Sequence, residues 1–372
     1  AVIEHKNNLD VVSMLEGSSY RAVFRDDKGA VGSLQESQGC PLSPHLVQNN
    51  TRLKAIPSYH WASFTDAGTA QGTIARFMGS STQMIVVIGY WTHGATKDTN
   101  PFNTTNEDVG LSCEKQYLAM AAFLVKAGLN PVFHKDKTHA FLNIAGDSNH
   151  DDIGSSKEDI GRALYYFTAG ENVWKQTSTW PPVGICKQRF YFADNAALAS
   201  EAPTDEEGKD AYRVNYEAGT GAFTRWSTQL GRGDVNYGNR SRADELLLVY
   251  TSMPLSQDIE ITGHPVITLQ MTSTESDGAV IVYLEDVAPD GRVTMLTEGG
   301  LRLIHRKVSA EKPPYPQFGP YHTFERKDAS PMESGKVAEL GFDLLPLSVR
   351  VKAGHALRVA IAGHDKDSFE RV

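Results

Sequence analysis

The chain has 372 residues, a formal net charge of -9, and 40% hydrophobic against 22% charged residues. These totals are ordinary for a globular protein of two or three domains, and the acidic balance without a Lys/Arg-rich run argues against nucleic-acid binding. Because no run of about 18 apolar residues occurs, the sequence predicts no membrane-spanning helix.

The N-terminal part of the chain is predicted to begin with a helix and a linker. Residues 1–50 start with a helical pattern and continue into a segment rich in Gly, Ser and Gln. Residues 56–64, IPSYHWASF, then predict a short strand. A helix is expected over 66–79, with Ile74 and Phe77 on its apolar face and a glycine at its end.

The alternation of strand and helix continues to residue 164. Residues 83–91, QMIVVIGYW, are a continuous apolar run, which is typical of a strand buried on both faces of a parallel sheet. Ser112 is expected to cap a helix that Gly128 ends. Residues 51–164 are therefore predicted to belong to an α/β domain.

From residue 165 onward the pattern is all-β. Residues 265–272 alternate apolar and polar side chains, and residues 279–299 predict a hairpin that turns at APDG. Residues 356–363, ALRVAIAG, place three apolar side chains on one face. Strands at this spacing predict a β-sandwich or jelly roll over residues 165–372.

Two polar residues follow successive predicted strands, at the point where each strand ends. Asp66 follows the first strand and His93 follows the second. Because α/β proteins bind ligands at the carboxyl ends of their strands, both side chains are expected at one edge of the sheet. A carboxylate bonded to one imidazole nitrogen leaves the other nitrogen free to take a proton from a nucleophile. By spacing alone, a helix cap and a surface histidine are the more common interpretation.

The sequence around these residues resembles a known family. YHWASFTDAGTAQGTIARFMG, followed by IVVIGYWTHG, resembles the Asp-to-His region of the cocaine esterase and X-Pro dipeptidyl-peptidase family of α/β-hydrolases. The likeness continues over residues 170–182, 250–293 and 319–324. It implies the C-terminal part of an α/β-hydrolase sheet, followed by a jelly-roll domain of the galactose-binding-like kind that is cut short at residue 372.

The resemblance also implies an activity. Asp66 would be the orienting acid and His93 the general base of a serine hydrolase that cleaves an ester or amide through an acyl-enzyme. Members of the family include esterases, acylases and dipeptidyl-peptidases, and the sequence does not rank these substrates. Residues 1–50 would then be the end of a helical cap domain and its linker.

Residues 16–22, EGSSYRA, resemble the G-x-S-Y-x-G turn that carries the family's nucleophile, although an alanine replaces the last glycine. Such a turn needs a buried strand before it and a helix after it, whereas the preceding apolar residues recur at a helical spacing. Ser19 is therefore interpreted as part of the cap. The nucleophile and oxyanion donors are expected upstream of Ala1, so that the chain would be a fragment inactive by itself.

Three positions depart from the family pattern. Tyr90 replaces a usual proline and Thr92 a usual serine, and both flank the histidine. Thr65 stands where an aromatic residue is common, so the pocket wall is expected to differ. For Trp61 and Trp91, which flank the proposed pair, lining a substrate pocket and packing in the core are equally good interpretations.

No cofactor or metal site is predicted. Cys40, Cys113 and Cys186 are too far apart for a zinc motif or an evident disulfide framework, and residues 147–152, DSNHDD, match no EF-hand or zinc spacing. The expected partner is a small-molecule ester or amide, with neither nucleic acid nor membrane, and a homo-oligomer is left open. The alternative function is a non-catalytic β-sandwich binding module.

Overall fold

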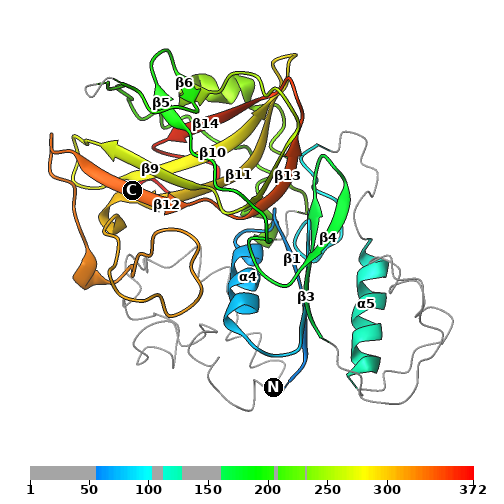
Figure 1. Cartoon of the computed structure of the whole chain (residues 1–372). Coiled ribbons are helices and arrows are strands. Elements are labelled where there is room, and N and C mark those ends of the chain that lie inside the picture. The colour runs from blue at the N-terminus through cyan, green and yellow to red at the C-terminus, as the bar shows by residue number, and fades with distance from the viewer. Residues whose placement is uncertain (1–55, 103–111, 128–160, 205–207, 231–232) are drawn as a thin grey trace.

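The computed structural model describes residues 56–102, 112–127, 161–204, 208–230 and 233–372 (Figure 1). The predicted cap end and linker over residues 1–50, which include Ser19, lie outside the described residues. So does the acidic segment 147–152.

The first sheet has four strands in the order β1-β2-β3-β4. β1 (Ser58–Ser63), β2 (Met84–Gly89) and β3 (Arg162–Thr168) are parallel, and β4 (Val173–Thr177) is antiparallel to β3. The predicted strands at 56–64 and 83–91 are confirmed. In β2 every residue but Ile85 is buried, as expected for an apolar run covered on both faces.

Two helices cover opposite faces of this sheet (Figure 1). The predicted helix after β1 is α4 (Thr69–Gly79), which buries Ile74 and Phe77 against the sheet. α5 (Cys113–Lys126) begins after Ser112, whose side chain accepts a hydrogen bond from the backbone N–H of Lys115 at 3.4 Å. The predicted N-cap is therefore confirmed, and it satisfies one of the free N–H groups of the first turn.

Strand β3 crosses the predicted boundary between residues 164 and 165. Leu164 pairs with Val86 of β2 on one side and with Thr177 of β4 on the other. Both β3 and β4 therefore belong to the first sheet. The sequence run RALYYFTAG indicates a strand, but its pattern does not say whether its neighbours are parallel or antiparallel.

The remaining strands lie between residues 191 and 362 and form a β region of three further sheets. A six-stranded sheet has the order β11-β10-β14-β7-β6-β5, and two-stranded ribbons are formed by β12 with β9 and by β13 with β8. The bounds are β5 (Tyr191–Ala193), β6 (Ala197–Ala199), β7 (Leu248–Thr251), β8 (Ile259–Gly263), β9 (Val266–Met271), β10 (Ala279–Val287), β11 (Val293–Arg302), β12 (Ala338–Asp343), β13 (Leu347–Val351) and β14 (Ala356–Ala362). Short 3₁₀ helices are η5 (Ser227–Leu230), η6 (Arg240–Leu246), η7 (Leu303–His305) and η8 (Arg326–Asp328).

The predicted hairpin and face alternation of this β region are confirmed. β10 and β11 pair antiparallel, and the turn between them is closed by Ala288 N–H donating to the carbonyl of Arg292 at 2.9 Å. In β14, Leu357, Val359 and Ile361 join the large core, whereas Ala360 and Ala362 pack in a smaller cluster on the other face. The large core also contains residues of the first sheet, so the two parts share one apolar interior.

A seam of hydrogen bonds joins the first sheet to the β region. Ala169 donates its N–H to the carbonyl of Ser348 at 3.0 Å and accepts from the N–H of Arg350 at 2.7 Å. The Tyr90 hydroxyl donates to the same Ser348 carbonyl at 3.0 Å, and the Thr168 and Ser348 hydroxyls are 2.9 Å apart. Tyr90 is fully buried, which raises the pKa of its phenol. Tyr90, which replaces the proline usual in the family, therefore contributes to the contact between the first sheet and the β region.

An aromatic junction lies beside this seam. Trp180 packs against Phe64 and Tyr166 of the first sheet and donates its indole N–H to His264 Nδ1 of the β region at 3.2 Å. The His264 ring stacks on Phe318 with a centroid distance of 4.4 Å. Burial lowers the pKa of His264 to about 3, so the ring stays neutral and accepts the indole N–H.

Candidate active site

Asp66 and His93 come together beyond the ends of β1 and β2. The last residues of these strands, Ser63 and Gly89, are in register, so both following loops leave the sheet at the same edge. His93 Nδ1 lies 3.1 Å from Asp66 Oδ2. Asp66 is 6% exposed, whereas the His93 side chain is 54% exposed. With Nδ1 bound to the carboxylate, Nε2 is the nitrogen left to meet a nucleophile.

The loop after β1 turns sharply and frees the Asp66 side chain from helix capping. The Asp66 carbonyl accepts from the Thr69 N–H at 3.0 Å and from the Thr69 hydroxyl at 2.8 Å. The N-cap of α4 is Gly68, and no side chain caps that end. The carboxylate therefore points to the histidine and does not serve as the helix cap that spacing alone would suggest.

Buried hydroxyl groups tie the two strand ends together. Ser63 Oγ accepts from the Trp91 N–H at 3.0 Å and from the Thr65 N–H at 3.1 Å. Thr65 is itself buried, and its hydroxyl contacts Ser63 Oγ at 3.0 Å and the hydroxyl of Thr99. Thr65 thus forms part of this network, because a small hydroxyl residue fits between the two loops.

Trp91 packs in the core on the α5 side of the sheet. It is 5% exposed and lies near Trp174, at a centroid distance of 6.2 Å. A Cβ atom on Gly89 would lie 2.0 Å from the Trp91 ring, so only glycine fits there. Trp61, which is half-buried, contacts Tyr117 of α5 edge-on. Of the two interpretations of Trp91, core packing is the one that the structure supports.

The β region contributes two residues to the Asp66–His93 pair. Gln229, in η5, donates its side-chain N–H to Asp66 Oδ1, and its Nε2 also lies 3.0 Å from His93 Nδ1. The neighbouring Thr228 accepts the backbone N–H of His93 on its hydroxyl at 3.0 Å. Sequence reasoning missed both residues, since they lie in a short irregular segment with no motif and far along the chain from Asp66.

A buried ion pair anchors the segment that carries these residues. Arg225 Nε lies 3.5 Å from Glu298 Oε1 of β11, and both side chains are buried. The Trp226 indole N–H donates to the same carboxylate oxygen at 2.7 Å. Burial raises the pKa of Glu298, and the Arg225 guanidinium partly offsets that rise. On its other side, Arg225 accepts the Ala67 N–H on its carbonyl at 3.1 Å.

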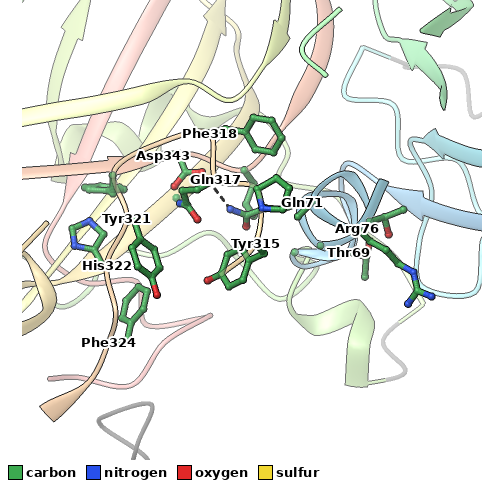
Figure 2. Close-up of a pocket in the computed structure, with 18 of the residues that line it drawn as sticks. Thr69, Gln71, Arg76, Tyr315, Gln317, Phe318, Tyr321, His322, Phe324 and Asp343 are labelled. Atoms are coloured by element: carbon green, nitrogen blue, oxygen red, sulfur yellow. Dashed lines mark hydrogen bonds between the residues drawn. The ribbon is translucent and has the colours of Figure 1, made fainter. Parts of the chain in front are cut away.

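A cavity of about 1440 Å³ lies between α4 and the segment that leads to β12 (Figure 2). Gln71 donates to Asp343 at 3.3 Å across it, and Tyr315 and Tyr321 lie nearby. Burial raises the pKa of Asp343. The residues that line this cavity do not include Asp66 or His93, so it is separate from the pair.

A second Asp–His contact lies in the β region. There His355 Nδ1 is 2.8 Å from Asp286 Oδ1, but this contact is not at the ends of parallel strands. Within the described part of the chain, no cluster of three or more His, Cys, Asp or Glu residues could hold a metal ion. The helices in that part are also too short or too polar to cross a membrane.

Known proteins resemble the chain over most of its length. The family described as the X-Pro dipeptidyl-peptidase C-terminal non-catalytic domain matches residues 155–372. A Mycobacterium bovis protein named as a serine esterase is 37% identical over 387 residues, covering 99% of this chain and 56% of that protein. Cocaine esterase from Rhodococcus sp. is 22% identical over 220 residues, covering 55% of this chain and 34% of that protein.

A solved structure shares the fold. The aminopeptidase from a marine-sediment Thaumarchaeota archaeon matches 84% of this chain and 48% of its own, with a TM-score of 0.57 and 19% identity. The chain thus spans about half the length of the Mycobacterium bovis protein and of this aminopeptidase. Since the domain match covers more than half of the chain, the chain belongs to the cocaine esterase and X-Pro dipeptidyl-peptidase family of hydrolases.

Proposed function

We propose that the chain is the C-terminal part of a serine hydrolase that cleaves an ester or an amide. In this proposal Asp66 is the orienting acid and His93 the general base. The observation that carries the proposal is the 3.1 Å contact between His93 Nδ1 and Asp66 Oδ2 at the ends of adjacent parallel strands. The order of the two residues along the chain is also that of α/β-hydrolases.

The proposed chemistry needs a serine from a segment that precedes Ala1. His93 Nε2 would take the proton from the serine hydroxyl while its oxygen attacks the substrate carbonyl, and Asp66 would stabilise the resulting imidazolium. The imidazolium would then protonate the leaving alcohol or amine, leaving an acyl-enzyme that water hydrolyses. The share of the Mycobacterium bovis protein that this chain spans, 56%, is consistent with a missing nucleophile segment.

The finer features of the proposal come from the family. The β region would be a jelly roll of the galactose-binding-like kind that packs beside the active site. The substrate would be a small ester or amide, and dipeptidyl-peptidase activity is one form of this chemistry. Ser19, which has no strand pattern before it, would belong to the cap and not to the nucleophile turn.

A fluorophosphonate probe tests the proposal on the full-length protein, because it labels only an activated serine. We expect His93→Ala to abolish labelling, since the triad members act as a unit. His355→Ala is the matched control, because it removes the other Asp–His contact and should leave labelling intact.

Two results would count against the proposal. Labelling that persists in His93→Ala would remove the proposed base from the mechanism. A full-length protein that is never labelled, although folded, would favour the alternative of a non-catalytic binding module.

A further inference from the structure

We propose that Gln229 is a positioning residue for the Asp66–His93 pair, so that the β region completes the active site. This inference rests on the proposed function and deepens it. It assigns part of the acid–base machinery to the stretch matched by a domain described as non-catalytic.

Two consecutive residues, Thr228 and Gln229, support different members of the pair. Gln229 donates its side-chain N–H to the acid, and the Thr228 hydroxyl accepts the backbone N–H of the base. Both residues lie in η5 (Ser227–Leu230), so one short helical turn contacts both members of the pair. The pair and its two supports therefore form one hydrogen-bonded group built from both parts of the protein.

The carboxylate is the group that needs support. The terminal torsion of an aspartate is broad and nearly two-fold, so one hydrogen bond to His93 does not fix its plane. Asp66 Oδ2 faces His93 Nδ1 at 3.1 Å, and Oδ1 receives the amide N–H of Gln229. Two donors on two oxygens set that plane, which keeps Oδ2 aimed at the imidazole.

The Asp66 carboxylate selects the histidine tautomer, because Oδ2 accepts a proton only from Nδ1, and the orientation of that carboxylate is held by Gln229. Its Nε2 lies 3.0 Å from His93 Nδ1, and both nitrogens converge on the same carboxylate. A proton on His93 Nδ1 is directed to Asp66, while the Gln229 N–H is directed to the other oxygen. This arrangement leaves Nε2 of His93 unprotonated, which is the form that a general base requires.

The support is stiff because its segment is anchored in the β region. Arg225 and Trp226, just before η5, both contact the Glu298 carboxylate of β11. Ser227 Oγ accepts the Thr224 N–H at 2.9 Å and donates to the Thr224 carbonyl, also at 2.9 Å. Gln229 itself is exposed, so its replacement should not disturb the core.

A second glutamine provides a matched control. Gln71 of α4 donates to Asp343 of β12 at 3.3 Å, which is also a glutamine–aspartate bond between the first sheet's layer and the β region. Figure 2 shows that this bond lies across the cavity, within a different set of residues. Gln71→Ala therefore removes an equivalent link without touching the proposed acid or base.

The experiment compares Gln229→Ala, Gln229→Glu and Gln71→Ala in the full-length protein, with a small aryl ester as substrate. Loss of a hydrogen bond to a charged group, partly replaced by water, should lower kcat on the order of tenfold in Gln229→Ala with KM nearly unchanged. Gln229→Glu at pH 8 places an acceptor where a donor is needed, so its kcat should be no higher than that of Gln229→Ala. Gln71→Ala should keep the wild-type kcat.

A spectroscopic measurement on the 372-residue chain does not depend on activity. The low-field proton NMR signal of His93 Nδ1–H should be sharp in wild type and Gln71→Ala, and broadened by exchange with water in Gln229→Ala. Equal kcat and equal signals in the two alanine variants would overturn the inference, as would wild-type kcat in Gln229→Glu. If His93→Ala still reacts with the fluorophosphonate, the proposed function fails; if only the Gln229 results fail, the function stands.

Discussion

The buried histidine at the aromatic junction predicts an acid-sensitive free energy of unfolding. His264 has a pKa lowered to about 3 by burial, against 6.5 for the free side chain. Well above pH 6.5 the ring is neutral in both the folded and the unfolded chain. As the pH falls below 6.5 the unfolded chain takes up a proton that the folded protein does not, so the stability present at neutral pH is lost progressively towards pH 3. Between pH 7 and pH 5 this linkage amounts to about 2 kcal/mol.

The variant that isolates this effect is His264→Gln, which does not titrate and keeps an acceptor for the Trp180 indole N–H. Denaturant unfolding followed by tryptophan fluorescence at pH 7 and pH 5 gives the free energy of unfolding at each pH. We expect wild type to lose about 2 kcal/mol more than the variant between these values. His60, whose pKa is lowered to about 4 by burial and by Arg76, is present in both proteins and cancels.

The result that would refute the reasoning is an equal loss in the two proteins. It would mean that the His264 ring accepts a proton in the folded state, and hence that the indole N–H does not hold it in the neutral form. A variant that is less stable by the same amount at both pH values would show a packing cost without any linkage.

Three further predictions concern the supports of the site. Ser63→Ala removes the acceptor for two buried N–H groups and should lower the unfolding free energy by about 1–3 kcal/mol in denaturant melts; no change would show that water replaces the hydroxyl. Arg225→Met should cost about 3–5 kcal/mol by leaving Glu298 unpaired, and adding Glu298→Leu should recover part of it; additive losses would argue against the ion pair. Gly89→Ala should displace Trp91 and cost about 1–3 kcal/mol, and an unchanged tryptophan emission spectrum would contradict that close contact.

Local pattern predicted the elements well because their causes are local. The apolar run at 83–91 indicated a strand buried on both faces, and the N-cap at Ser112 was predicted from its side chain. The 279–299 hairpin followed from alternation around a turn sequence. Asp66 and His93 could be placed near one another because the ends of adjacent parallel strands share an edge.

The features that escaped prediction depend on contacts between distant segments. Nothing in RALYYFTAG says that β3 lies beside β2 and not in the β region. Gln229 reaches Asp66 only because Arg225 is anchored on β11, which no spacing in the sequence reveals. Thr65 is a departure from the family pattern whose role became visible only with its partners in space.

The domain that is matched in relatives does not coincide with a complete folding unit of this chain. The matched domain starts at residue 155, yet it contains β3 and β4, which finish the first sheet. Expressed by itself, such a piece would carry β3 with an uncovered parallel edge, and open edges of this kind template aggregation. Chimeras between relatives should therefore exchange β1 to β4 together, so that none of these four strands is separated from the others.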